Sequence, residues 1–209
     1  MTVRLIDLTG WFLSIIGGMA LVGWFIGNEL LRTWAASNIP VKIEAAVLFV
    51  LHGMMLVAIN HYKRYPTPST FVVPVLLSLY GLVMSAWIMI AYATQSNSFI
   101  DINNQIYEVL TMTPDQAPLG TIICFVLSAI NGIVLTLMRR PFLISVLLGS
   151  AIFGIAISVL AGFLLNADSL YYKSDVSTGM ALPTALGFSL LGIAYILSSN
   201  TSIRDRKPI

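Results

Sequence analysis

The polar residue with the clearest chemical potential in this sequence lies inside a long apolar run. His52 stands near the centre of the run 43–61, where an imidazole could bind a proton, a ligand or a haem iron. Haem ligation is the weaker alternative, because the other histidine, His61, lies on the opposite face of a helix. A hydrogen bond from His52 to a neighbouring helix is the more common role, and it is the first expectation.

Three further polar side chains interrupt apolar runs. Ser128 and Asn131 lie about one helical turn apart in the run 119–138, and Tyr80 lies in the run 70–93. Polar groups inside a membrane need partners, so Ser128 and Asn131 are expected to form hydrogen bonds between helices. The functional alternative is a ligand site lined by these three residues and His52. Tyr80 belongs to an aromatic stripe that is more typical of packing.

No motif for catalysis or metal binding accompanies these residues. The sequence has no glycine-rich phosphate loop, no paired nucleophile and base, and no metal-ligand spacing. Its one cysteine, Cys124, excludes an intrachain disulfide. The basic residues are scattered over turns and tails, so nucleic acid is not an expected partner. We therefore expect a protein without enzyme activity, cofactor or metal.

The amino-acid composition indicates whether these residues lie in water or in lipid. The chain is 57% hydrophobic and only 10% charged, whereas soluble domains carry about 25% charged residues. Its apolar runs are continuous and near the length of about 20 residues that crosses a bilayer as a helix. The sequence predicts an all-α integral membrane protein with one transmembrane domain, 1–209, and six spans: 8–31, 43–61, 70–93, 119–138, 142–166 and 180–198.

The basic residues predict the orientation of the spans. Because positive charge is retained on the cytoplasmic side, the side with more Lys and Arg should be cytoplasmic. Eight cations fall on one side: Arg4, Lys63, Arg64, Arg139, Arg140, Arg204, Arg206 and Lys207. Three fall on the other side: Arg32, Lys42 and Lys173. Both termini are therefore expected in the cytoplasm, with lipid headgroups as partners of the basic side.

The longest connector, 94–118, lies on the predicted outer side. Its segment 100–110, IDINNQIYEVL, has apolar residues at helical spacing. This pattern predicts a short amphipathic helix on the outer surface. The segment is either a plain connector or a lid over a pocket that opens outward.

A motif recurs in the second, fourth and sixth runs. It has Thr or Ala first, Phe four residues on, Leu two further and Gly or Ala two beyond that. Its copies are Ala45, Phe49, Leu51, Gly53; Thr121, Phe125, Leu127, Ala129; and Thr184, Phe188, Leu190, Gly192. We call this the repeat motif. It predicts three hairpins, about 8–61, 70–138 and 142–198, each running in–out–in and related by an axis along the membrane normal.

Small residues in two runs predict close helix contacts. Gly23 and Gly27 have the spacing of the Gly-x-x-x-Gly motif, and Gly149 and Gly154 lie in the fifth run. Such residues let two backbones approach closely, within the chain or between copies in a homodimer.

The last runs resemble a known membrane region. Residues 178–198 read TGMALPTALGFSLLGIAYILS, and residues 112–135 read MTPDQAPLGTIICFVLSAINGIVL. Both are similar to helices of the N-terminal multi-helix sensor region of bacterial histidine kinases and diguanylate cyclases, typified by TGMALHTALxFLLLG and MxPNTALxFLLLG. The resemblance covers about residues 70–200. It implies the bacterial inner membrane, signal reception, a homodimer, and a kinase or cyclase output domain as cytoplasmic partner.

Two departures from that pattern bear on function. Pro183 stands where the family has His, and the sequence ends at Ile209 without a catalytic domain. We expect either an isolated input region or a stand-alone relative, in both cases a sensory or regulatory module. The alternatives are an accessory subunit of a larger membrane complex, or a small protein that binds or transports an apolar ligand such as a quinone or lipid.

Overall fold

The chain forms a bundle of helices in the computed structural model, which describes residues 2–34, 39–94, 117–138, 140–171 and 179–200. Within these ranges there is no strand. The long helices are α1 (Thr2–Phe25), α3 (Ile43–Arg64), α4 (Pro68–Thr94), α6 (Leu119–Leu137), α7 (Phe142–Leu165) and α8 (Leu182–Ser199). All six are long and apolar enough to cross a membrane, which confirms the all-α class and the six predicted apolar helices. The amphipathic helix predicted at 100–110 lies outside the described residues, as does most of the connector 94–118 that was considered either a plain loop or a lid.

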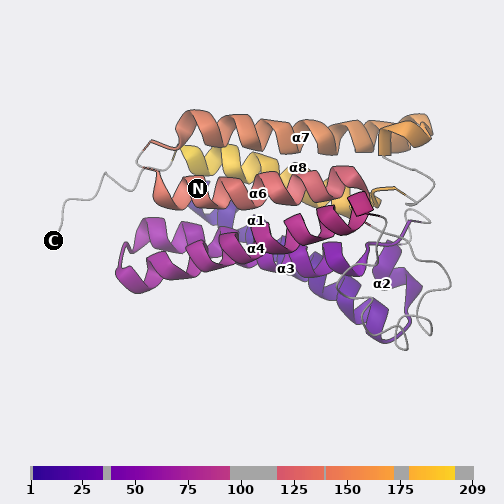
Figure 1. Cartoon of the computed structure of the whole chain (residues 1–209), viewed down its shortest axis with the longest axis horizontal. Coiled ribbons are helices and arrows are strands. Elements are labelled where there is room, and N and C mark those ends of the chain that lie inside the picture. Colours follow the sequence, from indigo (N-terminus) through magenta and orange to yellow (C-terminus); the bar gives the residue numbers. More distant parts are fainter. Residues whose placement is uncertain (1, 35–38, 95–116, 139, 172–178, 201–209) are drawn as a thin grey trace.

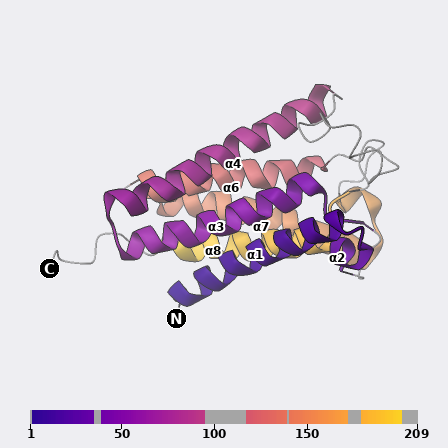
Figure 2. The same cartoon turned by 90° about the horizontal axis from the view of Figure 1, so that it is seen from below.

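Successive long helices run in opposite directions along the bundle (Figures 1 and 2). The most extensive contacts join α1 with α3 and α7 with α8, followed by α4 with α6. Short turns connect α3 to α4 and α6 to α7 at the same end of the bundle, where α1 begins and α8 ends (Figure 1). This arrangement brings segments far apart in the sequence to one end of the molecule.

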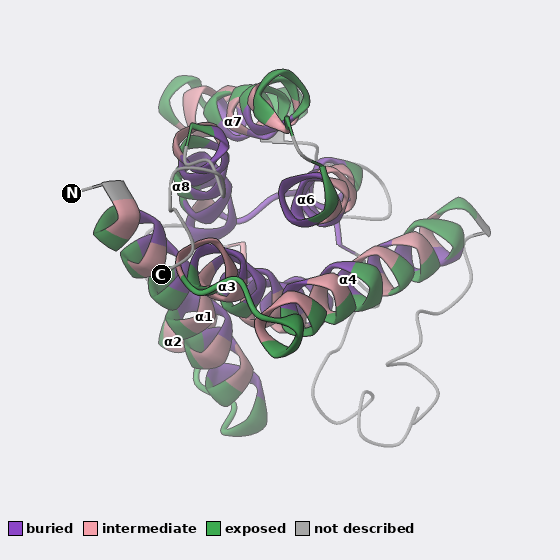
Figure 3. Ribbon diagram, turned by 90° about the vertical axis from the view of Figure 1, so that its left-hand side faces the viewer, coloured by how far each residue is buried: buried purple, intermediate pink, exposed green. Residues whose placement is uncertain are grey.

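Three helices form the centre of the bundle. The most apolar windows of α3, α6 and α8 are 61%, 67% and 67% buried, whereas those of α1, α4 and α7 are only 28–39% buried. Figure 3 shows the buried surfaces of the central helices turned toward one another and the exposed surfaces of the outer helices turned away. The outer helices expose large apolar side chains, as lipid-facing helices do.

The first predicted span is wrong in its extent. Helix α1 covers Thr2–Phe25, not 8–31, and a separate short helix, α2 (Glu29–Thr33), follows it. Gly27 adopts φ +69°, a left-handed conformation that glycine tolerates well. Asn28 then caps α2 by accepting a hydrogen bond from Leu31 N at 3.3 Å. Gly27, Asn28 and Glu29 interrupt the apolar run with residue types that end one helix and cap the next, so the break carried a local signal that the span prediction passed over.

Glycines bring two helix pairs together, although only part of the prediction is correct. A Cβ at Gly10 would lie 2.6 Å from Val57 Cγ2, so α1 approaches α3 closely at that point. Gly27 lies beyond α1 with nothing near its Cβ position. The spacing of Gly23 and Gly27 therefore does not mark a contact between two long helices.

Between α7 and α8 the close contact involves one of the two glycines predicted there. A Cβ on Gly149 would lie 2.9 Å from the carbonyl oxygen of Gly192. A Cβ on Gly192 would in turn lie 2.7 Å from that of Gly149. Gly154, by contrast, would meet nothing within 4 Å. The small residues of α7 therefore differ in role although both lie in the same apolar run.

Candidate functional site

The phenylalanines of the repeat motif meet at the centre of the bundle. Phe49 of α3, Phe125 of α6 and Phe188 of α8 are all fully buried. The ring centroid of Phe49 lies 5.0 Å from those of both Phe125 and Phe188, which are 4.7 Å from each other. Aromatic pairs at this spacing contribute about 0.5–1.5 kcal/mol each beyond the area they bury. We call these residues the phenylalanine cluster.

The rest of the repeat motif shows why the phenylalanines converge. Its first residues, Ala45, Thr121 and Thr184, are also buried, at 1–2% exposure. They share a helix face with the phenylalanines because residues four apart lie one turn above each other. The leucines of the motif are less buried: Leu190 is 38% exposed, and Leu51 and Leu127 are only partly buried. The motif therefore marks the inward faces of α3, α6 and α8.

His52 lies beside the phenylalanine cluster. Its side chain is 1% exposed, and its ring centroid is 5.0 Å from that of Phe125. Nδ1 is 2.8 Å from the carbonyl oxygen of Leu48, so Nδ1 carries the hydrogen and donates. Nε2 is buried without a hydrogen-bond partner among the described residues. The partner of Nδ1 therefore belongs to His52's own helix, while the backbone of Phe125 on the neighbouring helix α6 also interacts with the imidazole.

Helix α4 approaches His52 at a glycine. A Cβ on Gly81 would lie 3.0 Å from His52 Cε1. The imidazole therefore fills space that an ordinary side chain at position 81 would occupy. Tyr80, which the sequence placed with His52 in one site, is 52% exposed. Consecutive helix residues point about 100° apart, so Gly81 facing inward leaves Tyr80 outside this buried region.

A second buried polar group joins α6, α7 and α8. The hydroxyl oxygens of Ser128 and Tyr195 are 2.6 Å apart. Asn131 Nδ2 donates to the carbonyl oxygen of Ser145 at 3.4 Å, and Ser145 Oγ donates to that of Tyr195 at 3.4 Å. All four side chains are fully buried. This confirms the expected hydrogen bonds between helices for Ser128 and Asn131 and separates them from Tyr80.

The sequence interpretation missed Ser145 and Tyr195. Tyr195 lies mid-span among apolar residues, and a buried tyrosine normally needs a partner for its hydroxyl. The sequence could therefore have indicated that Tyr195 forms a hydrogen bond inside the bundle. It could not have indicated which residue is the partner. Ser128 is adjacent only because α6 and α8 both face the centre of the bundle.

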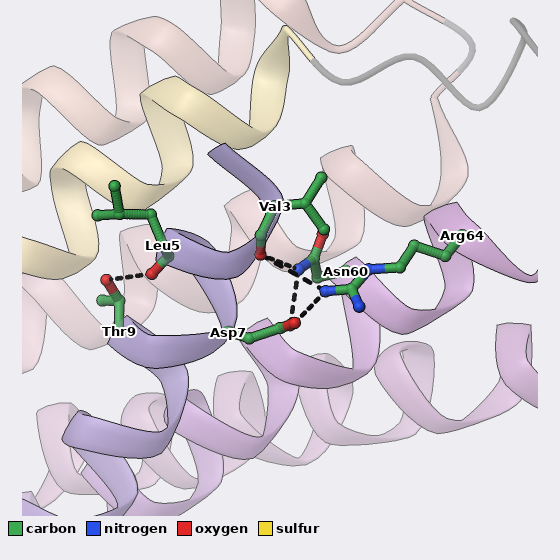
Figure 4. A network of polar contacts seen from close by, with 6 residues as sticks. All are labelled: Val3, Leu5, Asp7, Thr9, Asn60 and Arg64. Atoms are coloured by element: carbon green, nitrogen blue, oxygen red, sulfur yellow. Dashed lines mark hydrogen bonds and ion pairs between the residues drawn. The ribbon is translucent and has the colours of Figure 1, made fainter. Parts of the chain in front are cut away.

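A polar network joins α1 and α3 at the end of the bundle where α1 begins (Figure 4). Asn60 Nδ2 donates to the carbonyl oxygen of Val3 at 2.8 Å and to Asp7 Oδ1 at 2.6 Å. Arg64 forms an ion pair with the other carboxylate oxygen of Asp7. This network anchors the first turns of α1 to the last turns of α3.

The end of α8 is joined to the same part of α3. Lys63 Nζ donates to the carbonyl oxygen of Ser198 at 2.6 Å and to its hydroxyl at 3.0 Å. The basic end of α3 therefore contacts both the first and the last described helix of the chain.

The described residues contain no group of three or more His, Cys, Asp and Glu side chains that could hold a metal ion. His61, the other histidine, is exposed near the end of α3 and does not share the environment of His52. The structure therefore does not pair the two histidines around one buried site.

Comparisons of this chain with protein-family models, curated proteins and solved structures found no match. The resemblance to kinase and cyclase sensor regions therefore stays a prediction. The functional argument depends on the phenylalanine cluster and on the polar contacts around it.

Proposed function

We propose that this protein is a membrane-embedded sensory or regulatory module that changes its helix packing and passes the change to a cytoplasmic partner or output domain, without catalysis of its own. The observation that carries the proposal is the phenylalanine cluster, in which one residue from each predicted hairpin meets the other two. A displacement of one hairpin must then alter its contacts with both others. Closely packed interiors respond to such displacements by switching between discrete arrangements.

The distribution of charge supports the orientation of this module. The basic turns and the network of Asp7, Asn60 and Arg64 lie at one end of the bundle. With that end in the cytoplasm, the chain obeys the positive-inside rule. The proposed arrangement is three in–out–in hairpins, α1 with α3, α4 with α6 and α7 with α8, in the bacterial inner membrane.

Helix α8 is the element best placed to transmit a change. Phe188 contacts the other two members of the cluster, Tyr195 bonds to α6, and Ser198 accepts from Lys63 of α3. Gly192 additionally brings α8 against α7. The position of α8 therefore depends on the packing of all three proposed hairpins, and its last turn lies at the proposed cytoplasmic end.

The proposal requires two packings whose populations respond to conditions. We would replace Cys124 by Ala, introduce Pro66→Cys in the α3–α4 turn and Asn200→Cys at the end of α8, and attach spin labels. Distances between the labels would be measured in reconstituted bilayers over a range of pH, lipid composition and redox conditions. Two distance populations with a condition-dependent ratio support a sensory module.

One invariant distance under all conditions would contradict the sensory role. Purification from native membranes supplies the comparison with an accessory subunit, because an accessory subunit should show a single packing and co-purify in fixed ratio with other membrane chains. A Phe188→Ala variant serves as positive control, since removal of a central ring should broaden the distance distribution.

A further inference from the structure

A groove of about 440 Å³ lies on the outer surface of the bundle, between α1 and α4. Its lining comes from α1 (Trp11), from α3 (Met54, Val57, Ala58, His61) and from α4 (Ser69, Thr70, Val73, Leu77). Figure 3 shows α1 and α4 diverging on either side of α3. Its volume lies within the range of about 300–1,000 Å³ that is usual for small-molecule sites.

The groove has one polar end. His61, Ser69 and Thr70 lie at the end of α3 and the start of α4, next to the connecting turn. The other lining side chains are apolar. From His61 to Met54 the groove follows α3 for about 10 Å, at a rise of 1.5 Å per residue. This length corresponds to roughly two thirds of one leaflet of a hydrocarbon core about 30 Å thick.

The end of the bundle at which His61, Ser69 and Thr70 lie carries an excess of positive charge. By the helix bounds, the described charged residues at this end of the bundle are four cations and one carboxylate: Arg4, Lys63, Arg64, Arg140 and Asp7. The carboxylate of Asp7 is already paired with Arg64. An incoming anion therefore meets net positive charge, and His61 is the titratable side chain that lines the groove itself.

We infer that this groove binds one anionic phospholipid, with an acyl chain along Val57, Ala58 and Val73 and the phosphate beside His61. An amphipathic ligand fits because the apolar and polar parts of the groove follow each other along the membrane normal. The charge favours an anionic headgroup over a zwitterionic one. The inference rests on the membrane placement proposed above but not on the sensory role.

The test is thermal unfolding of the detergent-purified chain during titration with phosphatidylglycerol or phosphatidylcholine, combined with mass spectrometry of co-purifying lipid. Phosphatidylglycerol should raise the Tm in a saturable manner and more than phosphatidylcholine does. Ala58→Phe should fill the groove and abolish the saturable shift. Ala151→Phe, at an exposed position of α7, is the matched control and should respond as the unmodified chain does.

His61→Ala isolates the headgroup contact. It should reduce the difference between phosphatidylglycerol and phosphatidylcholine while leaving the response to phosphatidylcholine unchanged. If Ala58→Phe fails to fold, Val73→Trp closes the groove from α4 instead. Equal shifts with both lipids would overturn the headgroup assignment. A saturable shift that persists in the groove-filling variants would overturn the groove as the site.

Discussion

The rings of Phe125 and Phe188 pack edge to face, with centroids 4.7 Å apart, although they belong to different helices. Both occupy the Phe position of the repeat motif, and Phe49 from the first copy contacts each of them. A single local pattern, written three times, therefore produces one central contact.

Removal of one ring of the phenylalanine cluster should lower the free energy of unfolding substantially. Phe188→Ala creates a cavity in a fully buried position, and such changes cost about 3–5 kcal/mol. The free energy of unfolding, measured in mixed detergent micelles, checks this value. The matched control is Phe142→Ala on α7, whose side chain is 53% exposed and should change stability little. Equal losses in both variants would show that the cluster is not the centre of stability.

The hydroxyl of Tyr195 should couple to Ser128. A double-mutant cycle with Tyr195→Phe and Ser128→Ala isolates their interaction, which is 2.6 Å long and fully buried. Hydrogen bonds between membrane helices average about 0.6 kcal/mol and reach about 1.7 kcal/mol, and we expect a coupling energy in this range. Tyr80→Phe should have no measurable effect, because Tyr80 is half exposed. A coupling energy of zero would contradict the contact.

Replacement by alanine should destabilise the protein at Gly192 but not at Gly154. Gly192→Ala places a Cβ 2.7 Å from the carbonyl oxygen of Gly149, and overpacking of this kind costs about 1–3 kcal/mol. Gly154→Ala meets nothing within 4 Å and should not destabilise the protein. Unfolding of both variants under identical conditions tests the prediction. Destabilisation by Gly154→Ala would show a contact that the single chain lacks, as in a homodimer.

The ion pair of Asp7 and Arg64 should contribute modestly to the stability of the protein. Their side chains are 26% and 31% exposed, and pairs at such surfaces contribute about 0–1 kcal/mol. Asp7→Asn can still accept the hydrogen bond from Asn60 and should lose only the charge. Asp7→Ala loses both contacts and should be less stable than Asp7→Asn. Added salt should lower the free energy of unfolding of the unmodified chain but not that of the Asp7→Asn variant. An equal salt response in both would exclude a stabilising ion pair.

Labelling of single cysteines tests the proposed orientation. In a Cys124→Ala background, Pro66→Cys lies in the α3–α4 turn and Leu170→Cys lies after α7, at the opposite end of the bundle. A membrane-impermeant maleimide should label Leu170→Cys in spheroplasts with intact inner membranes. It should label Pro66→Cys only after the inner membrane is permeabilised. The reverse pattern would place the basic turns outside.

Local composition was sufficient for the helices and for their inward faces. Each apolar run forms its own backbone hydrogen bonds, so six helices could be predicted from the sequence before any contact was known. The repeat motif likewise placed Phe49, Phe125 and Phe188 on corresponding faces, because helical periodicity is a property of each segment alone. The break at Gly27 was missed because the span was drawn from average hydropathy, although Gly27 and the capping residue Asn28 mark it locally.

Partnerships between helices were decided only by the tertiary structure. The sequence marked Ser128 as polar and buried, but not that Tyr195 would meet it, nor that Asp7 would pair with Arg64. It also grouped Tyr80 with His52, whereas Gly81 is the residue that faces the imidazole. The physical reason is the same in each case. A residue's type determines that it needs a partner, whereas the relative rotation and crossing of two helices determine which partner comes within reach.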